Sequence, residues 1–355
     1  MIRMQRGMVL DIQQFKGIRK MTGNNRDPFV NCYYTPILSV VNYYKKSIFP
    51  VIINPFFYYE RVSRISYPTG YLRVKIENIN KLSLILNTMG IESYYSTPKP
   101  EEILSYIREN IESGSPILVN IDMFYQKGRD EYYRKKHDGK HVILIYGYND
   151  LDQTINFLDD VNGYSEYTMK YEELMVYYKG LFDYCNISYN LGNTTCAFIK
   201  GDYNQFNKAE SRINQIKEFS AAIIKNKRKI IVGLEELQYL IQIQHNIKND
   251  ESILSALSST IQRKKSQKYQ YLYLDKLGVF PPNYKIEMEN YLNTIINNWT
   301  VVRNIIGKSV YQGIYLQNSK NTVIDFIDDI YEKERLFHTH LYSIIENGNT
   351  KLTID

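Results

Sequence analysis

The spacing of apolar residues divides the chain into two parts with different patterns. Up to about residue 200, short apolar runs alternate with polar turns, which is typical of strands and short helices in a mixed domain. From about residue 206, apolar residues recur every three or four positions over long stretches, which predicts amphipathic helices. We therefore predict an α+β domain over 1–205, followed by an all-helical bundle domain over 206–355.

Residues 141–148 (HVILIYGY) form the clearest strand, because a continuous β-branched run is expected of a strand covered on both faces. The polar segment 149–153 predicts a hairpin turn into a second strand, 154–160. A Gly-Ser-Pro turn precedes another apolar strand at 117–124. Further strands are expected at 49–59, 70–76 and 194–200.

Helical spacing of apolar residues also marks the predicted helices. One is expected just after Cys32, because Ile37, Val40 and Val41 lie on one face and Pro36 suits a first helical turn. The first part should contain two more helices, at 101–112 and 167–180. In the second part, the apolar stripes cover 213–223, 234–241, 251–264, 284–306 and 320–346.

Composition excludes several classes of protein. Hydrophobic residues make up 44% and charged residues 23%, so wholesale disorder is excluded, and a net charge of +6 does not indicate a nucleic-acid partner. The chain lacks a run of 18 apolar residues and a secretory signal, so we expect no membrane span and a cytoplasmic location. Three cysteines without a CxxC pair predict neither a disulfide scaffold nor structural zinc. Without a P-loop or GxGxxG motif, no ATP, NAD or resident metal is expected.

Of the three cysteines, Cys32 is the candidate nucleophile. It follows a polar segment and precedes a helix, whose N-terminal dipole and unpaired N–H groups favour a thiolate. Cys185 and Cys196 have apolar neighbours and no acid–base partner in the pattern, so we interpret them as inert, buried side chains.

A thiolate nucleophile needs a histidine and a group that orients it. His141 opens the clearest strand, and Asp159 and Asp160 end the next strand of the same hairpin. Neighbouring antiparallel strands lie about 5 Å apart, so either aspartate could reach the imidazole. A cysteine at a helix start, a histidine on a strand and an acid on the adjacent strand form the papain-type arrangement.

Two segments carry a resemblance to a known family: 31–46 (NCYYTPILSVVNYYKK) and 113–160, which includes SPILVNID, HVILIYGYND and FLDD. Together they resemble the N-terminal domain of the butirosin biosynthesis protein H family, over roughly residues 25–200. The resemblance implies a papain-like cysteine-protease fold. It also favours Asp159 over Asp160, because Asp159 ends the FL run in register with the family's aspartate.

The resemblance further implies acyl transfer in nonribosomal natural-product (antibiotic) biosynthesis. Such an enzyme takes an acyl or peptidyl chain from a carrier-protein thioester and makes an amide with a small amine or diamine. No cofactor is then needed, since phosphopantetheine arrives on the carrier protein. Papain-like enzymes usually have a Gln about six residues before the Cys; that position is Arg26, so Asn25 is the expected oxyanion donor, with the amide of Cys32.

Two alternatives and one further feature stay open. The same three residues suit a cysteine peptidase or amidase, and the fold alone would suit a non-catalytic product-binding protein. Two basic clusters, 225–229 and 263–268, are either solvated helix ends or a docking surface for an acidic partner. His338 and His340 are interpreted as surface histidines.

Overall fold

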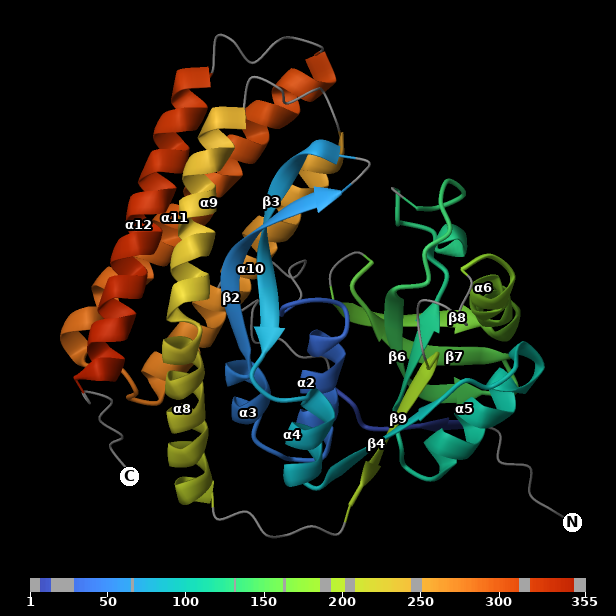
Figure 1. Ribbon diagram of the computed structural model, residues 1–355. Coiled ribbons are helices and arrows are strands. Elements are labelled where there is room, and N and C mark those ends of the chain that lie inside the picture. Colours follow the sequence, from blue (N-terminus) through green and yellow to red (C-terminus); the bar gives the residue numbers. More distant parts are fainter. Residues whose placement is uncertain are drawn as a thin grey trace, which may run out of the picture. The chain divides into compact units, whose positions relative to one another are not determined.

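The computed structural model describes residues 7–13, 29–64, 67–130, 132–161, 164–185, 193–201, 208–243, 251–312 and 320–347. The chain forms two compact units: Met1–Val51 with Asn80–Phe206, and Ile52–Ile79 with Asn207–Asp355. The first is a mixed α/β unit with an antiparallel sheet. The second contains the C-terminal helices (Figure 1).

The sheet of the first unit has seven strands in the order β4-β9-β5-β6-β7-β8, with β1 also pairing with β6, and all its pairs are antiparallel. Its strands are β1 (Gly7–Val9), β4 (Ile91–Ser96), β5 (Ile117–Ile121), β6 (His141–Asn149), β7 (Thr154–Asp159), β8 (Ser165–Lys170) and β9 (Thr195–Lys200). β6 is central and is buried along almost its whole length, which confirms the prediction for 141–148. The predicted hairpin is present as β6 and β7.

Within the described residues, four α-helices and two short 3-10 turns accompany the sheet. They are α2 (Tyr34–Tyr43), α4 (Leu82–Thr88), η1 (Pro100–Glu102), α5 (Ile103–Glu112), η2 (Met123–Tyr125) and α6 (Tyr171–Tyr184). Figure 1 shows α2 and α4 on one side of the sheet and α5 and α6 on the other. Hydrogen bonds fix α2 to the sheet region: Ser39 Oγ lies 3.2 Å from Tyr164 Oη, and Tyr44 Oη donates to the carbonyl of Phe198 at 2.6 Å.

Three predicted elements before residue 200 were wrong in part. The strand expected at 117–124 ends at Ile121, and η2 follows it. The run 49–59 was expected to be one strand, but it forms α3 (Phe49–Ile53) and then β2 (Pro55–Arg64). The run 167–180 was expected to be helical throughout, but its beginning belongs to β8. The helix begins only at Tyr171, where the side chain of Glu173 accepts the amide of Lys170 at 3.2 Å, so a cap outweighs the apolar spacing upstream.

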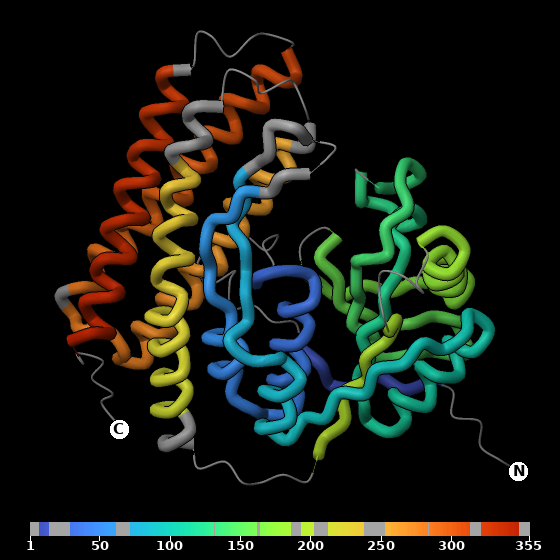
Figure 2. Tube along the Cα trace, viewed as in Figure 1, coloured from blue at the N-terminus to red at the C-terminus, as the bar shows by residue number. Residues whose placement is uncertain are grey.

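The second unit is not all-helical, because it includes the hairpin of β2 and β3 (Tyr67–Asn78). Its helices are α8 (Lys208–Lys225), α9 (Lys227–Ile243), α10 (Glu251–Lys276), α11 (Pro282–Gln312) and α12 (Lys320–Glu346). The trace in Figure 2 shows the hairpin running along α9 and α10. A Cβ at Gly233 of α9 would overlap the carbonyl of Tyr59, so glycine permits this close approach. The predicted domain of 1–205 is therefore corrected: 52–79 belongs with the helices.

A buried ion pair joins α10 to α12, and the hairpin contacts it through Tyr59. Lys264 Nζ lies 2.5 Å from Glu334 Oε1, which also accepts a 2.7 Å hydrogen bond from Tyr59 Oη. Trp299 Nε1 donates to the same hydroxyl at 2.9 Å. The 263–268 cluster was interpreted either as a solvated helix end or as a docking surface. Both interpretations are wrong for Lys264, because its side chain is fully buried. His338 is also buried, at 4% exposure, rather than on the surface, because it packs beside Glu334.

No helix within the described part of the chain is both long and apolar enough to cross a membrane.

Candidate active site

Cys32 lies in the turn that leads into α2. The side chain of Asn31 accepts the backbone amides of Tyr33 and Tyr34 at 2.9 and 3.0 Å, so it satisfies two N–H groups at the helix start. The thiol is half-buried and lies at the positive end of the helix dipole. The predicted position of Cys32 just ahead of the helix is confirmed.

The backbone before Cys32 is held in an unusual conformation. Val30 has φ of 65°, in the left-handed region, which costs a β-branched residue about 1–3 kcal/mol. A 2.8 Å hydrogen bond from the amide of Phe29 to Thr35 Oγ1 ties this turn to α2. The amide of Cys32 makes no backbone hydrogen bond to any described residue, so it can donate to an oxyanion. Asn25, the expected second donor, lies outside the described residues.

His141 and Asp159 meet as the sequence predicts. His141 Nε2 lies 2.7 Å from Asp159 Oδ1, and both side chains are buried, at the start of β6 and the end of β7. Asp160 Oδ1 is farther from the same nitrogen, at 3.9 Å. Of the two aspartates left open by strand alternation, Asp159 therefore orients the imidazole.

The thiol of Cys32 is close to this pair. Cys32 Sγ lies 3.8 Å from the carbonyl oxygen of Lys140, the residue that precedes His141. We assign the proton on Nε2 to the bond with Asp159, because a carboxylate can only accept.

Arg129 and Gln126 complete the cluster, and neither was predicted. Arg129 Nη2 donates to Asp159 Oδ1 at 2.9 Å and to Asp160 Oδ1, and its Nε donates to Gln126 Oε1 at 3.1 Å. Gln126 Nε2 in turn donates to Asp159 Oδ2. Both residues lie in an aperiodic, polar segment between β5 and β6, where apolar spacing carries no signal.

The charges in this cluster stabilise an imidazolium. Burial alone would lower the pKa of His141, but the charge and hydrogen bond of Asp159, with the hydrogen bond of Cys32, raise that pKa to about 10. Burial likewise opposes ionisation of Asp159, yet His141 and Arg129 hold its pKa at about 2. The positive charge of Arg129 acts against protonation of His141, so it limits the rise.

His141, Asp159 and Asp160 place three ligand atoms within 4.8 Å of one another, which is close enough for a metal ion. The Nη2 atom of Arg129, however, already lies 2.8 Å from His141 Nε2 and contacts both carboxylates. A guanidinium therefore supplies the positive charge that these acids need. The donor set fits an ion-pair cluster rather than a metal centre.

The other two cysteines lie in different surroundings. Cys185 is half-buried rather than fully buried, and burial together with Asp122 raises its pKa to about 12. Cys196 is buried in β9, and burial raises its pKa to about 12 as well. Both thiols should therefore be unreactive at neutral pH, as the sequence predicts.

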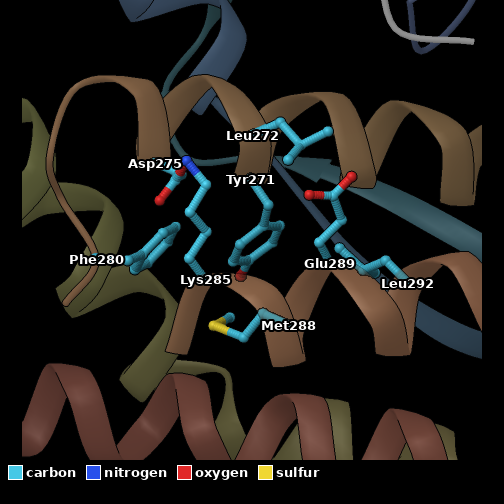
Figure 3. Close-up of a pocket in the computed structure, with 8 residues that line it drawn as sticks. All are labelled: Tyr271, Leu272, Asp275, Phe280, Lys285, Met288, Glu289 and Leu292. Carbon is cyan, nitrogen blue, oxygen red and sulfur yellow. The ribbon is translucent and has the colours of Figure 1, made fainter. Parts of the chain in front are cut away.

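The helical unit contains a small hollow between α10 and α11, shown in Figure 3. Its residues are Tyr271, Leu272, Asp275, Phe280, Lys285, Met288, Glu289 and Leu292. Lys285 Nζ lies 2.6 Å from Asp275 at one side of it. The hollow contains no cysteine or histidine, so it offers no nucleophile or proton-transfer group of the Cys–His type.

Comparisons with known proteins do not assign the chain to a family. No protein-family model matches the chain, and no curated protein matches it.

The two aspartates should differ in their effect on the thiol. We expect Asp159→Asn to slow alkylation of Cys32 by iodoacetamide at pH 7 by about tenfold or more, because it removes the charge that keeps His141 protonated. Asp160→Asn should change the rate by less than about threefold, because Asp160 is paired with Arg129 instead. Peptide mass spectrometry reports the labelled cysteine, and Cys32→Ala is the control. A larger effect of Asp160→Asn would contradict the assignment.

Arg129 should stabilise the folded protein, because it pairs with the carboxylates of Asp159 and Asp160. We expect Arg129→Gln to lower the free energy of unfolding by about 2–4 kcal/mol, because it leaves two neighbouring acids without their shared cation. Adding Asp160→Asn should recover part of the loss, because it removes one of the unpaired charges. Urea denaturation measures both variants. If the second substitution destabilises the protein further, the charge argument is wrong.

Proposed function

We propose that this protein is a cysteine-dependent acyltransferase that takes an acyl or peptidyl chain from a carrier-protein thioester and forms an amide with a small amine or diamine. The observation that carries the proposal is the imidazole of His141, which lies 2.7 Å from Asp159 and follows Lys140, whose carbonyl oxygen is 3.8 Å from the thiol of Cys32. The proposed fold of the first unit is papain-like. A helix-start thiol, a strand histidine and an acid on the adjacent strand of an antiparallel sheet support it.

In the first step, the thiolate of Cys32 attacks the thioester carbonyl. A bond forms between Sγ and the acyl carbon, and the bond from that carbon to the pantetheine sulfur breaks. The amide of Cys32 is available to stabilise the developing oxyanion. The imidazolium of His141 gives its proton to the departing pantetheine sulfur, so the step ends with an acyl-enzyme, a free thiol and a neutral imidazole.

In the second step, the amine attacks the acyl-enzyme. The new bond joins nitrogen to the acyl carbon, and the bond to Sγ breaks. His141 accepts the proton that the amine loses, which restores the thiolate and the imidazolium. Asp159 holds the ring in one orientation through both steps. A thioester is already an activated acyl donor, so the sequence of steps balances without ATP or another cofactor.

The direct test is intact-mass spectrometry of the protein mixed with an acyl-loaded carrier protein. We expect an acyl adduct on Cys32 that disappears, with formation of an amide, when a small diamine is added. Cys32→Ala should form neither adduct nor amide, and His141→Gln should form the adduct slowly.

Other outcomes of that experiment favour the rival functions. Cleavage of a peptide substrate without any carrier would support a cysteine peptidase or amidase with the same three residues. An inert Cys32, with the carrier still loaded and product bound tightly, would support a non-catalytic product-binding protein.

A further inference from the structure

The segment between β5 and β6 presents a group of positive charges that the proposed mechanism does not use. Its exposed cations, called here the basic face, are Lys127, Arg134, Lys135, Lys136 and Lys140. No carboxylate of a described residue lies within 4.0 Å of their charged nitrogens. Other cations are paired: Lys227 with Glu346 and Lys229 with Glu77, for example. Residues 126–140 contain six Lys and Arg against the three acids Asp130, Glu131 and Asp138, so an excess of positive charge remains to attract an external anion.

One end of the basic face, at Lys140, is adjacent to the candidate nucleophile. Lys140 immediately precedes His141, and its carbonyl oxygen lies 3.8 Å from Cys32 Sγ. Arg129, in the middle of the same segment, binds Asp159. A partner that binds to this segment would therefore lie beside the thiol.

Several contacts hold the segment in one conformation. The buried carboxylate of Asp122 accepts the amides of Phe124 and Asp138 at 3.1 and 3.0 Å and lies 2.6 Å from His137 Nδ1. The ring of His137 stacks between Phe124 and Tyr184, with centroid distances of 4.0 and 4.2 Å. Because these contacts fix the backbone, binding to the cations does not require the segment itself to become ordered.

Two of the cations are also oriented by neighbouring rings. The guanidinium of Arg134 lies 5.2 Å from the ring centre of Tyr133, and Lys136 Nζ lies 6.0 Å from that of Tyr132. The rings of Tyr132 and Tyr133 lie under these cations. The ring of His137 lies between those of Phe124 and Tyr184. The aromatic side chains are thus engaged with the protein, which does not suit stacking with bases of a nucleic acid.

We propose that the basic face is the docking surface for the acidic surface of the carrier protein that delivers the thioester; this rests on the proposed function. Complementary charge would speed the encounter and orient the carrier so that its thioester meets Cys32. Docking is thereby assigned to the unit that contains Cys32, rather than to the 263–268 cluster, in which Lys264 is buried.

The test compares two charge-reversed variants with two donors. Lys135→Glu/Lys136→Glu changes the basic face, and Lys81→Glu/Lys200→Glu makes the same change of charge at exposed sites elsewhere in the first unit. The donors carry the same acyl group, one on an acidic phosphopantetheinylated carrier protein and the other on free, uncharged pantetheine. The rate of adduct formation on Cys32 is followed by intact-mass spectrometry at low and at high salt.

We expect Lys135→Glu/Lys136→Glu to slow acylation from the carrier protein by about tenfold at low salt and to abolish its salt dependence. Its acylation from pantetheine should stay within about twofold of the wild type, because the donor is uncharged. The Lys81→Glu/Lys200→Glu variant should behave as the wild type with both donors. Equal losses in the two variants, or a loss with pantetheine as well, would overturn the proposal.

Two further measurements separate the possible failures. Binding of the unloaded carrier protein, measured by fluorescence anisotropy, should weaken only in Lys135→Glu/Lys136→Glu. If binding follows this pattern but Cys32 is never acylated, the proposed function fails and the docking surface stands. If acyl-coenzyme A matches the carrier protein as a donor and is equally sensitive to Lys135→Glu/Lys136→Glu, the surface recognises phosphate and the docking proposal is wrong.

Discussion

The buried carboxylate of Asp159 determines how the rest of the candidate site is built. An ionised acid in the interior needs cations and hydrogen-bond donors, and Asp159 has His141, Arg129, Gln126 and the amide of Asp160. Its charge favours the imidazolium form of His141. The positive charge of Arg129 opposes protonation of the ring, so it limits the rise in the pKa of His141.

The backbone brings these groups together from distant parts of the chain. Antiparallel pairing of β6 and β7 sets the start of one strand near the end of the other, so His141 meets Asp159. The strained turn at Val30 and the cap by Asn31 place Cys32 ahead of α2. The left-handed backbone at Val30 is strained, and such strain persists where the surrounding contacts impose a particular geometry.

Sequence patterns predicted the parts of the site that follow from regular structure. Cys32 at a helix start and His141 in a hairpin could be found because capping and β-periodicity are local. The role of Arg129 could not be predicted, because its segment has no periodic pattern and it binds Asp159 in a distant part of the sequence. The division into units was mispredicted for a related reason: strand β2 pairs locally with β3, but its packing against α9 and α10 involves residues far along the chain. Lys264 was likewise predicted to be an exposed charge, because its pairing with Glu334 depends on a contact between distant parts of the chain.

The protonation state of His141 tests the central claim most directly. Nitrogen-15 NMR of histidine-labelled protein, with the signal assigned by comparison with His141→Gln, follows the imidazole as pH is raised. We expect His141 to remain an imidazolium through pH 8 and to titrate near its pKa of about 10. Titration near the ordinary histidine pKa of about 6.5 would show that Asp159 does not hold the charge, and would contradict the account.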